Sequence, residues 1–227
     1  LKRQYAPDKR VALFDVDYSF SGKNVMLRGV TTSAEAKAAL LNGLSKADYQ
    51  VMDCLQVLPD EAALEGKTYG IINVSVSNLR VDPDFSSEMM TQGLMGMPVR
   101  VLQRDGWYRI QTPDNYIAWV HRVGIHPVTK EEFHVWNRAE KIVVTSHYGF
   151  VYSEPNQSSQ TVSDVVAGNR LKWEGTKGAF YKVAYPDGRT GYISKSISMP
   201  EKKWRAALKQ DAASIIRTCL LYTSDAA

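Results

Sequence analysis

Cysteine is scarce in this sequence, which contains two cysteines, Cys54 and Cys219, among 227 residues. Neither has another cysteine or a histidine at metal-ligand spacing, so the sequence predicts no metal site. Cys54 lies in an expected strand and should be a small buried apolar residue. Cys219 has eight residues after it and no histidine downstream, so it lacks the base that a catalytic thiolate needs. We therefore expect no catalytic residue, no metal ligand and no cofactor in this chain.

Long apolar runs and an excess of one charge are also missing. No run approaches the roughly 18 apolar residues that span a bilayer, so no transmembrane segment is expected. The 28 basic and 24 acidic residues leave a net charge of +4. The strongest basic cluster, Lys202, Lys203 and Arg205, lies on an expected helix. We interpret it as a solvated face and predict no nucleic-acid partner.

An internal repeat is the most informative feature that is present. The first copy contains Asn78-Leu79-Arg80-Val81-Asp82-Pro83, Ser86-Ser87 and Gly96. The second copy contains Phe150-Val151-Tyr152-Ser153-Glu154-Pro155, Ser158-Ser159 and Gly168, at an offset of 72 residues. After one inserted residue, Trp107-Tyr108 and Ala118-Trp119-Val120 align with Phe180-Tyr181 and Gly191-Tyr192-Ile193. Apolar, turn and aromatic positions stay in register, so the repeat predicts two domains of the same fold.

Each copy is expected to consist of short strands joined by tight turns. In the first copy, Arg104-Asp105-Gly106 separates two apolar segments and is a hairpin signal. Pro113-Asp114-Asn115 forms a further turn of the first copy, before the segment that begins at Tyr116. In the second copy, Pro186-Asp187-Gly188 has the same place before the segment that begins at Gly191. Short, aromatic-rich strands at close spacing favour a small β-barrel that closes its own edges.

The first 60 residues have a different pattern, which predicts a β-β-α-β unit. Strands are expected over residues 11–20, 24–30 and 49–58. Thr32 to Glu35 has the pattern of a helix capping box, and Ala38, Leu41 and Leu44 give the helix an apolar face that ends near Gly43. Nothing in this unit points to chemistry.

A helix is also expected at the other end, over residues 200–217. Ser198-Met199-Pro200-Glu201 has the pattern of a helix start with proline in the first turn. Trp204, Leu208 and Ile215 share one face of this helix, and that face needs a cover. Residues 218–227 continue neither this pattern nor the repeat, so we expect a non-native tail there.

The repeat unit resembles the bacterial SH3-like domain, whose pattern has a Leu-Arg strand, a proline turn, a Ser-Ser step, a glycine, Gly-Trp-Tyr and Gly-Trp-Val. The larger arrangement resembles the NlpC-type γ-D-glutamyl-L-diamino-acid endopeptidases, also called the dipeptidyl-peptidase VI type. In these enzymes, tandem barrels precede a cysteine-peptidase domain. The stretch from Lys202 to Arg217 looks like the helix that opens that domain, and the family's Asp-Cys-Ser-Gly motif is absent. The resemblance therefore implies that the catalytic domain is missing.

The expected fold is mainly β. Two tandem SH3-like β-barrels, over residues 67–130 and 138–199, follow a small α+β domain over residues 1–66 and precede one C-terminal helix. The chain begins with leucine and shows no signal peptide, so we expect a mature or truncated start. The resemblance implies a location in the cell envelope, either periplasmic or secreted.

The resemblance also implies a substrate-binding site on the first barrel. In the family, a glutamate of this barrel pairs with the free amine of the substrate's N-terminal L-alanine, and a tyrosine faces the catalytic residues. By motif these are Glu88 and Tyr116. The second copy has Gln160 and Arg189 at the matching positions, which fits a site on one barrel only.

Three functions remain open from the sequence. The first is a substrate-gating and targeting part of a cell-wall cysteine endopeptidase that cleaves γ-D-glutamyl-diamino acid bonds, itself inactive without the missing peptidase domain. Its partner would be a peptidoglycan stem peptide with a free N-terminal L-alanine. The second is a non-enzymatic peptidoglycan-binding envelope protein. The third is a protein whose barrels bind proline-rich peptides. The natural sequence beyond Arg217 would separate the first two.

Overall fold

The computed structural model describes residues 1–208, which form a mainly β structure, as the sequence predicts. These residues group into two compact units. One contains residues 1–93 and 98–135, and the other contains residues 94–97 and 136–208. The domain boundaries expected from the sequence stay predictions. Residues 209–217 of the expected C-terminal helix and the tail with Cys219 lie outside the described residues.

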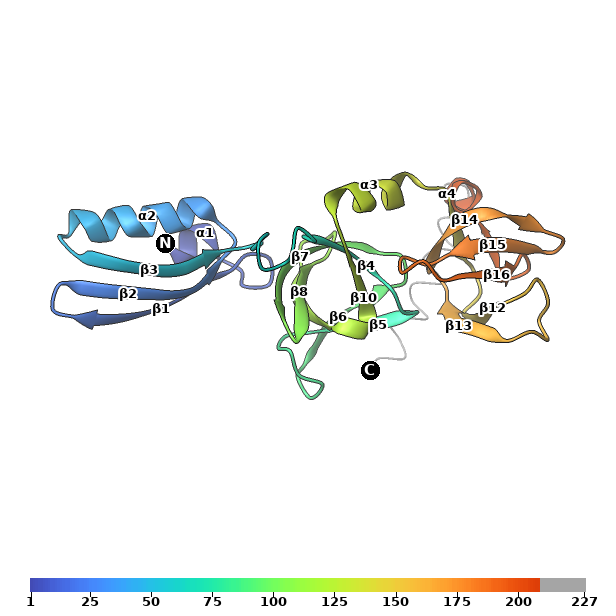
Figure 1. Cartoon of the computed structure of the whole chain (residues 1–227), viewed down its shortest axis with the longest axis horizontal. Helices are drawn as coiled ribbons and strands as arrows, with labels where there is room; N and C mark the ends of the chain where they lie inside the picture. The colour runs from blue at the N-terminus through green and yellow to red at the C-terminus, as the bar shows by residue number, and fades with distance from the viewer. Residues whose placement is uncertain (209–227) are drawn as a thin grey trace. The chain divides into compact units, whose positions relative to one another are not determined.

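The first unit begins with the expected β-β-α-β arrangement. After the short helix α1 (Lys2–Tyr5), it consists of β1 (Phe14–Ser21), β2 (Asn24–Thr31), α2 (Ala34–Lys46) and β3 (Gln50–Val57). β1 and β2 form an antiparallel hairpin, whereas β3 runs parallel to β2. Parallel neighbours need a long crossover, which α2 provides. Figure 1 shows α2 lying along the sheet that it connects.

Three local expectations for this region are wrong. The cap of α2 is Ser33 and not Thr32, because the Ser33 hydroxyl accepts a hydrogen bond from the Ala36 amide at 3.0 Å. The Thr32 hydroxyl instead accepts the Leu13 amide at 3.0 Å. The helix continues past Gly43 to Lys46. Its buried face is built on Ala36, with Leu40 packed against the same cluster.

Cys54 is exposed, so the expectation that it is a buried apolar residue is also wrong. It lies on β3 directly opposite Arg28 of β2. Directly opposite residues share a face of the sheet, and alternate residues point to opposite faces. Asp53, the neighbour of Cys54, forms an ion pair with Lys37 of α2, so Cys54 points away from the helix.

Each sequence repeat forms a seven-stranded antiparallel sheet, and the two sheets have the same strand order. The first sheet consists of β4 (Tyr69–Ile72), β5 (Val76–Arg80), β6 (Met89–Leu94), β7 (Pro98–Asp105), β8 (Trp107–Gln111), β9 (Ile117–His121) and β10 (Ile125–Val128). The second consists of β11 (Lys141–Val144), β12 (Tyr148–Tyr152), β13 (Thr161–Val166), β14 (Arg170–Lys177), β15 (Phe180–Ala184), β16 (Thr190–Ser194) and β17 (Ser198–Pro200).

The shared order supports the repeat found in the sequence. The first sheet runs β10-β4-β7-β8-β9-β5-β6, and the second runs β17-β11-β14-β15-β16-β12-β13 when it is read from the equivalent edge. Each strand of one sheet therefore has a counterpart in the other. Figure 1 shows the strands of each sheet curling around an interior. We call the two sheets the first and the second barrel.

A small apolar core joins the β-β-α-β region to the first barrel within the same unit. It contains Leu13, Leu58, Leu102 and Ile117. A β-bulge shifts the pairing of β7 with β8 between Val101 and Gln103. Because of this bulge, Val101 and Leu102 are both buried although they are neighbours on one strand.

The second unit includes residues 94–97, which precede β7 in the sequence. Met95 is buried in the core cluster of the second barrel, and its carbonyl accepts the Arg170 amide at 2.9 Å. Gly96 has φ of +85°, and a Cβ there would lie 2.1 Å from the Arg170 carbonyl oxygen. Only glycine fits this position, because both the backbone angle and the space exclude a side chain.

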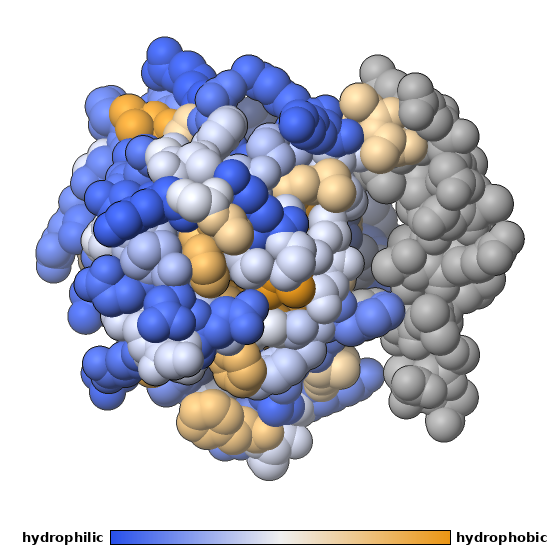
Figure 2. Space-filling view, turned by 90° about the vertical axis from the view of Figure 1, so that its right-hand side faces the viewer, coloured by the Kyte–Doolittle hydropathy of each residue, from blue (hydrophilic) through white to orange (hydrophobic). Residues whose placement is uncertain are grey.

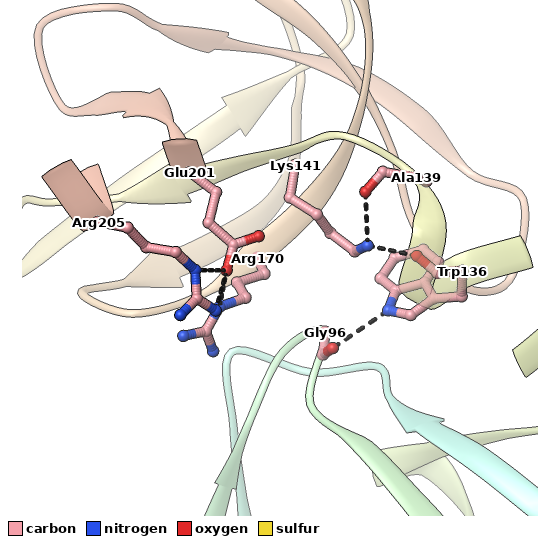
Figure 3. A network of polar contacts seen from close by, with 7 residues as sticks. All are labelled: Gly96, Trp136, Ala139, Lys141, Arg170, Glu201 and Arg205. Carbon is pink, nitrogen blue, oxygen red and sulfur yellow. Dashed lines mark hydrogen bonds and ion pairs between the residues drawn. The ribbon is translucent and has the colours of Figure 1, made fainter. Parts of the chain in front are cut away.

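A helix, α3 (Lys130–Arg138), precedes the second barrel. Hydrogen bonds hold the last turn of this helix to other residues of the second unit. The Trp136 indole donates to the Gly96 carbonyl at 3.2 Å. The Lys141 ammonium is buried and donates to the carbonyls of Trp136 and Ala139, as Figure 3 shows. A cation at a helix C-terminus satisfies carbonyls that have no partner in the helix.

The C-terminal helix α4 begins at Glu201, and its described part runs to Leu208. The expectation that Pro200 lies in the first turn is wrong, because Ser198 to Pro200 form β17 and pair with β11. The Ser198 hydroxyl donates to the Ser194 carbonyl instead of capping the helix. Glu201 accepts hydrogen bonds from Arg170 of β14 and Arg205 of α4 (Figure 3).

Two kinds of feature are absent from residues 1–208. None of the helices described there is long and apolar enough to cross a membrane. Within the same residues, no cluster of three or more histidine, cysteine or acidic side chains could hold a metal ion.

Candidate functional site

The loop between β5 and β6 carries Glu88, and hydrogen bonds within the loop fix its shape. These bonds run from Val81 N to Glu88 O at 3.0 Å, from Asp82 N to Ser87 Oγ at 3.0 Å, and from Ser86 N to Asp84 Oδ1 at 2.7 Å. The Arg80 guanidinium also donates to the Ser87 carbonyl. Short Asp and Ser side chains close such turns by bonding to nearby backbone amides. The loop is therefore ordered by its own residues.

The loop between β12 and β13 of the second barrel has nearly the same hydrogen bonds. The matching bonds run from Ser153 N to Gln160 O at 2.8 Å, from Glu154 N to Ser159 Oγ at 3.2 Å, and from Ser158 N to Asn156 Oδ1 at 3.0 Å. Every pair sits at the 72-residue offset of the sequence repeat. The two loops thus have the same backbone conformation and differ in their exposed side chains.

Glu88 is exposed at the end of its loop. Over residues 1–208 its carboxylate takes part in no hydrogen bond or ion pair, while its backbone carbonyl is held by Val81. The equivalent residue of the second barrel is Gln160, which carries no charge. The Glu88 carboxylate is therefore available to a cation from outside the described structure.

Tyr116 is half-buried and directly precedes β9. Its backbone carbonyl accepts hydrogen bonds from the amide and the hydroxyl of Thr112, which closes the turn between β8 and β9. The Asp8 carboxylate raises the pKa of the Arg10 guanidinium, and Tyr116 adds to this effect. Tyr116 thus lies at the end of the hairpin that faces the β-β-α-β region.

No hydrogen bond joins Glu88 to Tyr116 in the described part of the chain. Both residues belong to the same barrel, and the pairing of Arg80 with Trp119 sets the register between their strands. Their joint role at one substrate stays a prediction from the sequence.

The other end of the β8–β9 hairpin carries an aromatic cluster that the sequence analysis did not identify. Trp107 and His121 are directly paired, with ring centroids 5.0 Å apart. Phe85 folds over both of them from the β5–β6 loop, at 4.8 Å from Trp107 and 5.0 Å from His121. Phe85 is nevertheless 66% exposed. The turn at Pro113-Asp114-Asn115, which joins β8 to β9, could have revealed the Trp107–His121 pair. The contact of Phe85 depends on how its loop folds back.

Arg109 occupies the middle of the same strand face. Its guanidinium lies 5.4 Å from the Trp119 ring centroid and 3.6 Å from an Asp15 carboxylate oxygen of β1. Burial lowers the pKa of the Arg109 guanidinium, and Asp15 opposes this effect. The outer face of β8 and β9 is thus covered near Tyr116 and exposed near the aromatic cluster.

Two bacterial domain families match the two barrels. Residues 79–124 match the family described as the bacterial dipeptidyl-peptidase Sh3 domain, and both Glu88 and Tyr116 fall within this match. Residues 147–198 match the family described as the bacterial SH3 domain. A comparison with curated proteins finds no match.

Solved structures of NlpC/P60 proteins are similar to this chain at low identity. An NlpC/P60 family protein from Bacillus cereus is 19% identical with a TM-score of 0.49, over 58% of this chain and 55% of that chain. An NlpC/P60 endopeptidase from Photobacterium damselae subsp. piscicida is 15% identical with a TM-score of 0.45, over 63% of this chain and 35% of that chain. At these scores neither likeness establishes an activity for this chain.

The chain spans about half the length of the first of these structures and about a third of the second. Each barrel matches a bacterial SH3 family, and the two barrels have the same strand order. The two barrels are therefore bacterial SH3-type domains, and the first matches the dipeptidyl-peptidase type.

Proposed function

We propose that this chain is the substrate-gating and targeting part of a bacterial cell-wall cysteine endopeptidase of the NlpC/P60 type. The complete protein would cleave the γ-D-glutamyl bond to a diamino acid in peptidoglycan stem peptides, in the cell envelope or outside the cell. The observation that carries the proposal is the match of residues 79–124 to a dipeptidyl-peptidase Sh3 domain. This match includes the loop that presents Glu88.

The proposed role of Glu88 is to bind the free ammonium group of an N-terminal L-alanine. A carboxylate and an ammonium group form a charge-assisted hydrogen bond, which is among the stronger polar contacts. A stem peptide whose amine is still blocked in intact wall has no such charge, so it would be rejected. The Glu88 carboxylate is exposed, has no partner within residues 1–208 and lies on a loop of fixed shape, which supports this role.

The proposed role of Tyr116 is to face the catalytic residues of the peptidase domain, and this role rests on the motif alone. Its half-buried position at the end of the hairpin supports a fixed orientation. No such tyrosine is present in the second barrel, where Arg189 stands at the matching position.

The first test is a binding experiment with the tripeptide L-Ala-γ-D-Glu-diaminopimelate. We expect the tripeptide to shift amide signals of the β5–β6 loop in a nuclear magnetic resonance titration, and its N-acetylated form to have no such effect. The Glu88→Gln variant should weaken binding roughly tenfold, because it removes the charge and keeps the shape of the side chain. The matched control is Glu154→Gln, an exposed carboxylate on the equivalent loop of the second barrel, which should change nothing.

Equal binding of the acetylated and free peptides, or of the Glu88→Gln variant and the unchanged chain, would contradict the proposal. We also expect the chain to release no L-Ala-D-Glu dipeptide from this tripeptide. Dipeptide release by the chain alone, followed by mass spectrometry, would show that the peptidase activity does not reside in a further domain.

A further inference from the structure

The aromatic cluster of Phe85, Trp107 and His121 joins two parts of the first barrel that are separate in the sequence. Phe85 comes from the β5–β6 loop, in which it precedes Glu88 by three residues. Trp107 is the first residue of β8, and His121 is the last residue of β9. The cluster therefore attaches the loop that carries Glu88 to the hairpin that carries Tyr116 at its other end.

The contacts of Phe85 distinguish it from an ordinary exposed apolar side chain. Scattered apolar side chains are normal on protein surfaces. On the face shown in Figure 2, for example, the hydrophobic side chains form small separate patches among hydrophilic ones. Phe85 is exposed too, but its ring centroid lies 4.8 Å from that of Trp107 and 5.0 Å from that of His121. Tilted rings at such distances attract each other beyond the effect of their buried area, so Phe85 anchors its loop.

The shape of the loop does not depend on this cluster. The β12–β13 loop of the second barrel closes with nearly the same hydrogen bonds, although it has Gln157 at the position of Phe85. The equivalent strand pair of that barrel is Phe180 with Ser194, which has one ring in place of two. The cluster is therefore not needed to form the turn. Its effect is to fix where the formed turn lies against the β8–β9 hairpin.

A second contact of the same loop is also specific to the first barrel. The Arg80 guanidinium of β5 donates to the carbonyl of Ser87, the residue before Glu88. The counterpart of Arg80 in the second barrel is Tyr152, which has no guanidinium. Two attachments of the loop thus involve residues that only the first barrel has, and this is the barrel whose loop carries Glu88.

We propose that Phe85 is a positioning residue for Glu88. Its contacts with Trp107 and His121 hold the β5–β6 loop against the β8–β9 hairpin, so that the Glu88 carboxylate is in place before the stem peptide arrives. A ligand binds only the fraction of molecules that already has the competent conformation, and the cluster raises this fraction. The role in binding rests on the proposed function of Glu88, whereas the attachment of the loop does not.

The attachment is tested by nuclear magnetic resonance relaxation of backbone amides in the whole chain. We expect the amides of residues 84–88 to be as rigid as those of the strands, with order parameters of about 0.85. Phe85→Ala should lower these values toward about 0.6, because the loop loses its anchor. Phe85→Tyr keeps the ring and should keep the rigidity. The matched control, Gln157→Ala at the equivalent position of the second barrel, should leave both loops unchanged.

The effect on Glu88 is tested by titrating the same variants with L-Ala-γ-D-Glu-diaminopimelate. Phe85→Ala should weaken binding roughly fivefold, whereas Phe85→Tyr and Gln157→Ala should bind like the unchanged chain. Substitutions that act through one another are not additive. In the Glu88→Gln background, Phe85→Ala should therefore cause almost no further loss. Circular dichroism checks that the Phe85 variants keep their fold, which we expect because the side chain is exposed.

The attachment is overturned if Phe85→Ala leaves residues 84–88 as rigid as they are in the unchanged chain. The positioning role is overturned if Phe85→Ala binds the tripeptide as tightly as the unchanged chain. It is also overturned if Phe85→Ala weakens binding by the same factor in the Glu88→Gln background, because the ring would then contact the peptide itself. Failure of the unchanged chain to bind the tripeptide would refute the proposed function and this role with it, while the relaxation data would still decide the attachment.

Discussion

At the scale of single residues, Tyr185 shows how a buried polar group is accommodated in the second barrel. It belongs to the core cluster, and its hydroxyl forms a 2.6 Å hydrogen bond with the Ser163 hydroxyl. The Arg189 guanidinium lies 4.5 Å from the Tyr185 ring centroid. Burial raises the pKa of Tyr185 to about 12, although Ser163 and Arg189 favour the ionised form.

This pKa predicts a loss of stability at high pH. The unfolded chain releases the phenolic proton near pH 10, whereas the folded barrel keeps it until about pH 12. Raising the pH through this interval therefore favours the unfolded state, by roughly 2–3 kcal/mol at its upper end. Urea unfolding at pH 8 and pH 11.5 should show this loss in the unchanged chain and a smaller loss in Tyr185→Phe. At pH 8 that variant should lose only about 1 kcal/mol, for its hydrogen bond. An equal alkaline loss in both proteins would contradict the assignment to Tyr185.

The two barrels also differ in the side chains that their equivalent loops expose. The β5–β6 loop and its counterpart share the hydrogen bonds that close them, yet Phe85 and Glu88 stand where the second barrel has Gln157 and Gln160. A shared backbone with different exposed side chains is the arrangement expected of a duplicated binding domain.

At the scale of elements, α4 is attached to the second barrel through one carboxylate. Glu201 Oε1 accepts from Arg205 Nη2 at 2.7 Å and from Arg170 Nε at 3.2 Å. The Glu201 side chain is 19% exposed, so water screens these contacts only in part. The Arg170 guanidinium also lies 5.8 Å from the Trp204 ring centroid of α4.

The contrast with a neighbouring ion pair gives a prediction for this attachment. Lys202 of α4 pairs with Glu140, but both side chains are mostly exposed. Exposed ion pairs contribute between about 0 and 1 kcal/mol, whereas hydrogen bonds to partly buried charges contribute more. Glu201→Gln should therefore lower the free energy of unfolding of the second unit by about 1–2 kcal/mol. Glu140→Gln should change it by less than about 0.5 kcal/mol. Thermal and urea unfolding measure both effects, and equal effects would show that α4 is not held by Glu201.

At the scale of the whole molecule, the first unit combines two regions that the sequence presents as separate domains. Leu13 and Leu58 come from the β-β-α-β region, and Leu102 and Ile117 come from the first barrel. The Ile117 amide also donates to the Arg10 carbonyl at 2.6 Å. One apolar cluster and one backbone hydrogen bond thus join the two regions, so they should lose structure together.

Two substitutions on neighbouring residues of β7 test this coupling. Leu102→Ala opens a cavity between the regions and should cost about 2–5 kcal/mol. Val101→Ala opens a cavity inside the barrel instead. In hydrogen exchange, Leu102→Ala should speed exchange of the Ile117 and Leu13 amides more than Val101→Ala does at the same overall stability. If both variants leave those two amides equally protected, the regions are not coupled through Leu102.

The sequence by itself determined the repeated strands and the β-β-α-β unit, whereas helix α3 was not expected from it. Hairpin turns such as Arg104-Asp105-Gly106 and the period-two alternation of β12 are local, so short segments carry the information for the strands. The β-β-α-β order follows from the same local signals. Glu88 and Tyr116 were identified because the first copy of the repeat resembles a family motif. Their role stays a proposal.

Only the tertiary structure decided which side chains meet. Phe85 contacts Trp107 and His121 because a loop folds back over a hairpin, and Leu102 is buried because a bulge turns it toward another region. Cys54 is exposed because it points to the face of its sheet opposite α2. These outcomes depend on contacts between residues far apart in the chain, and periodicity within one segment contains no information about them.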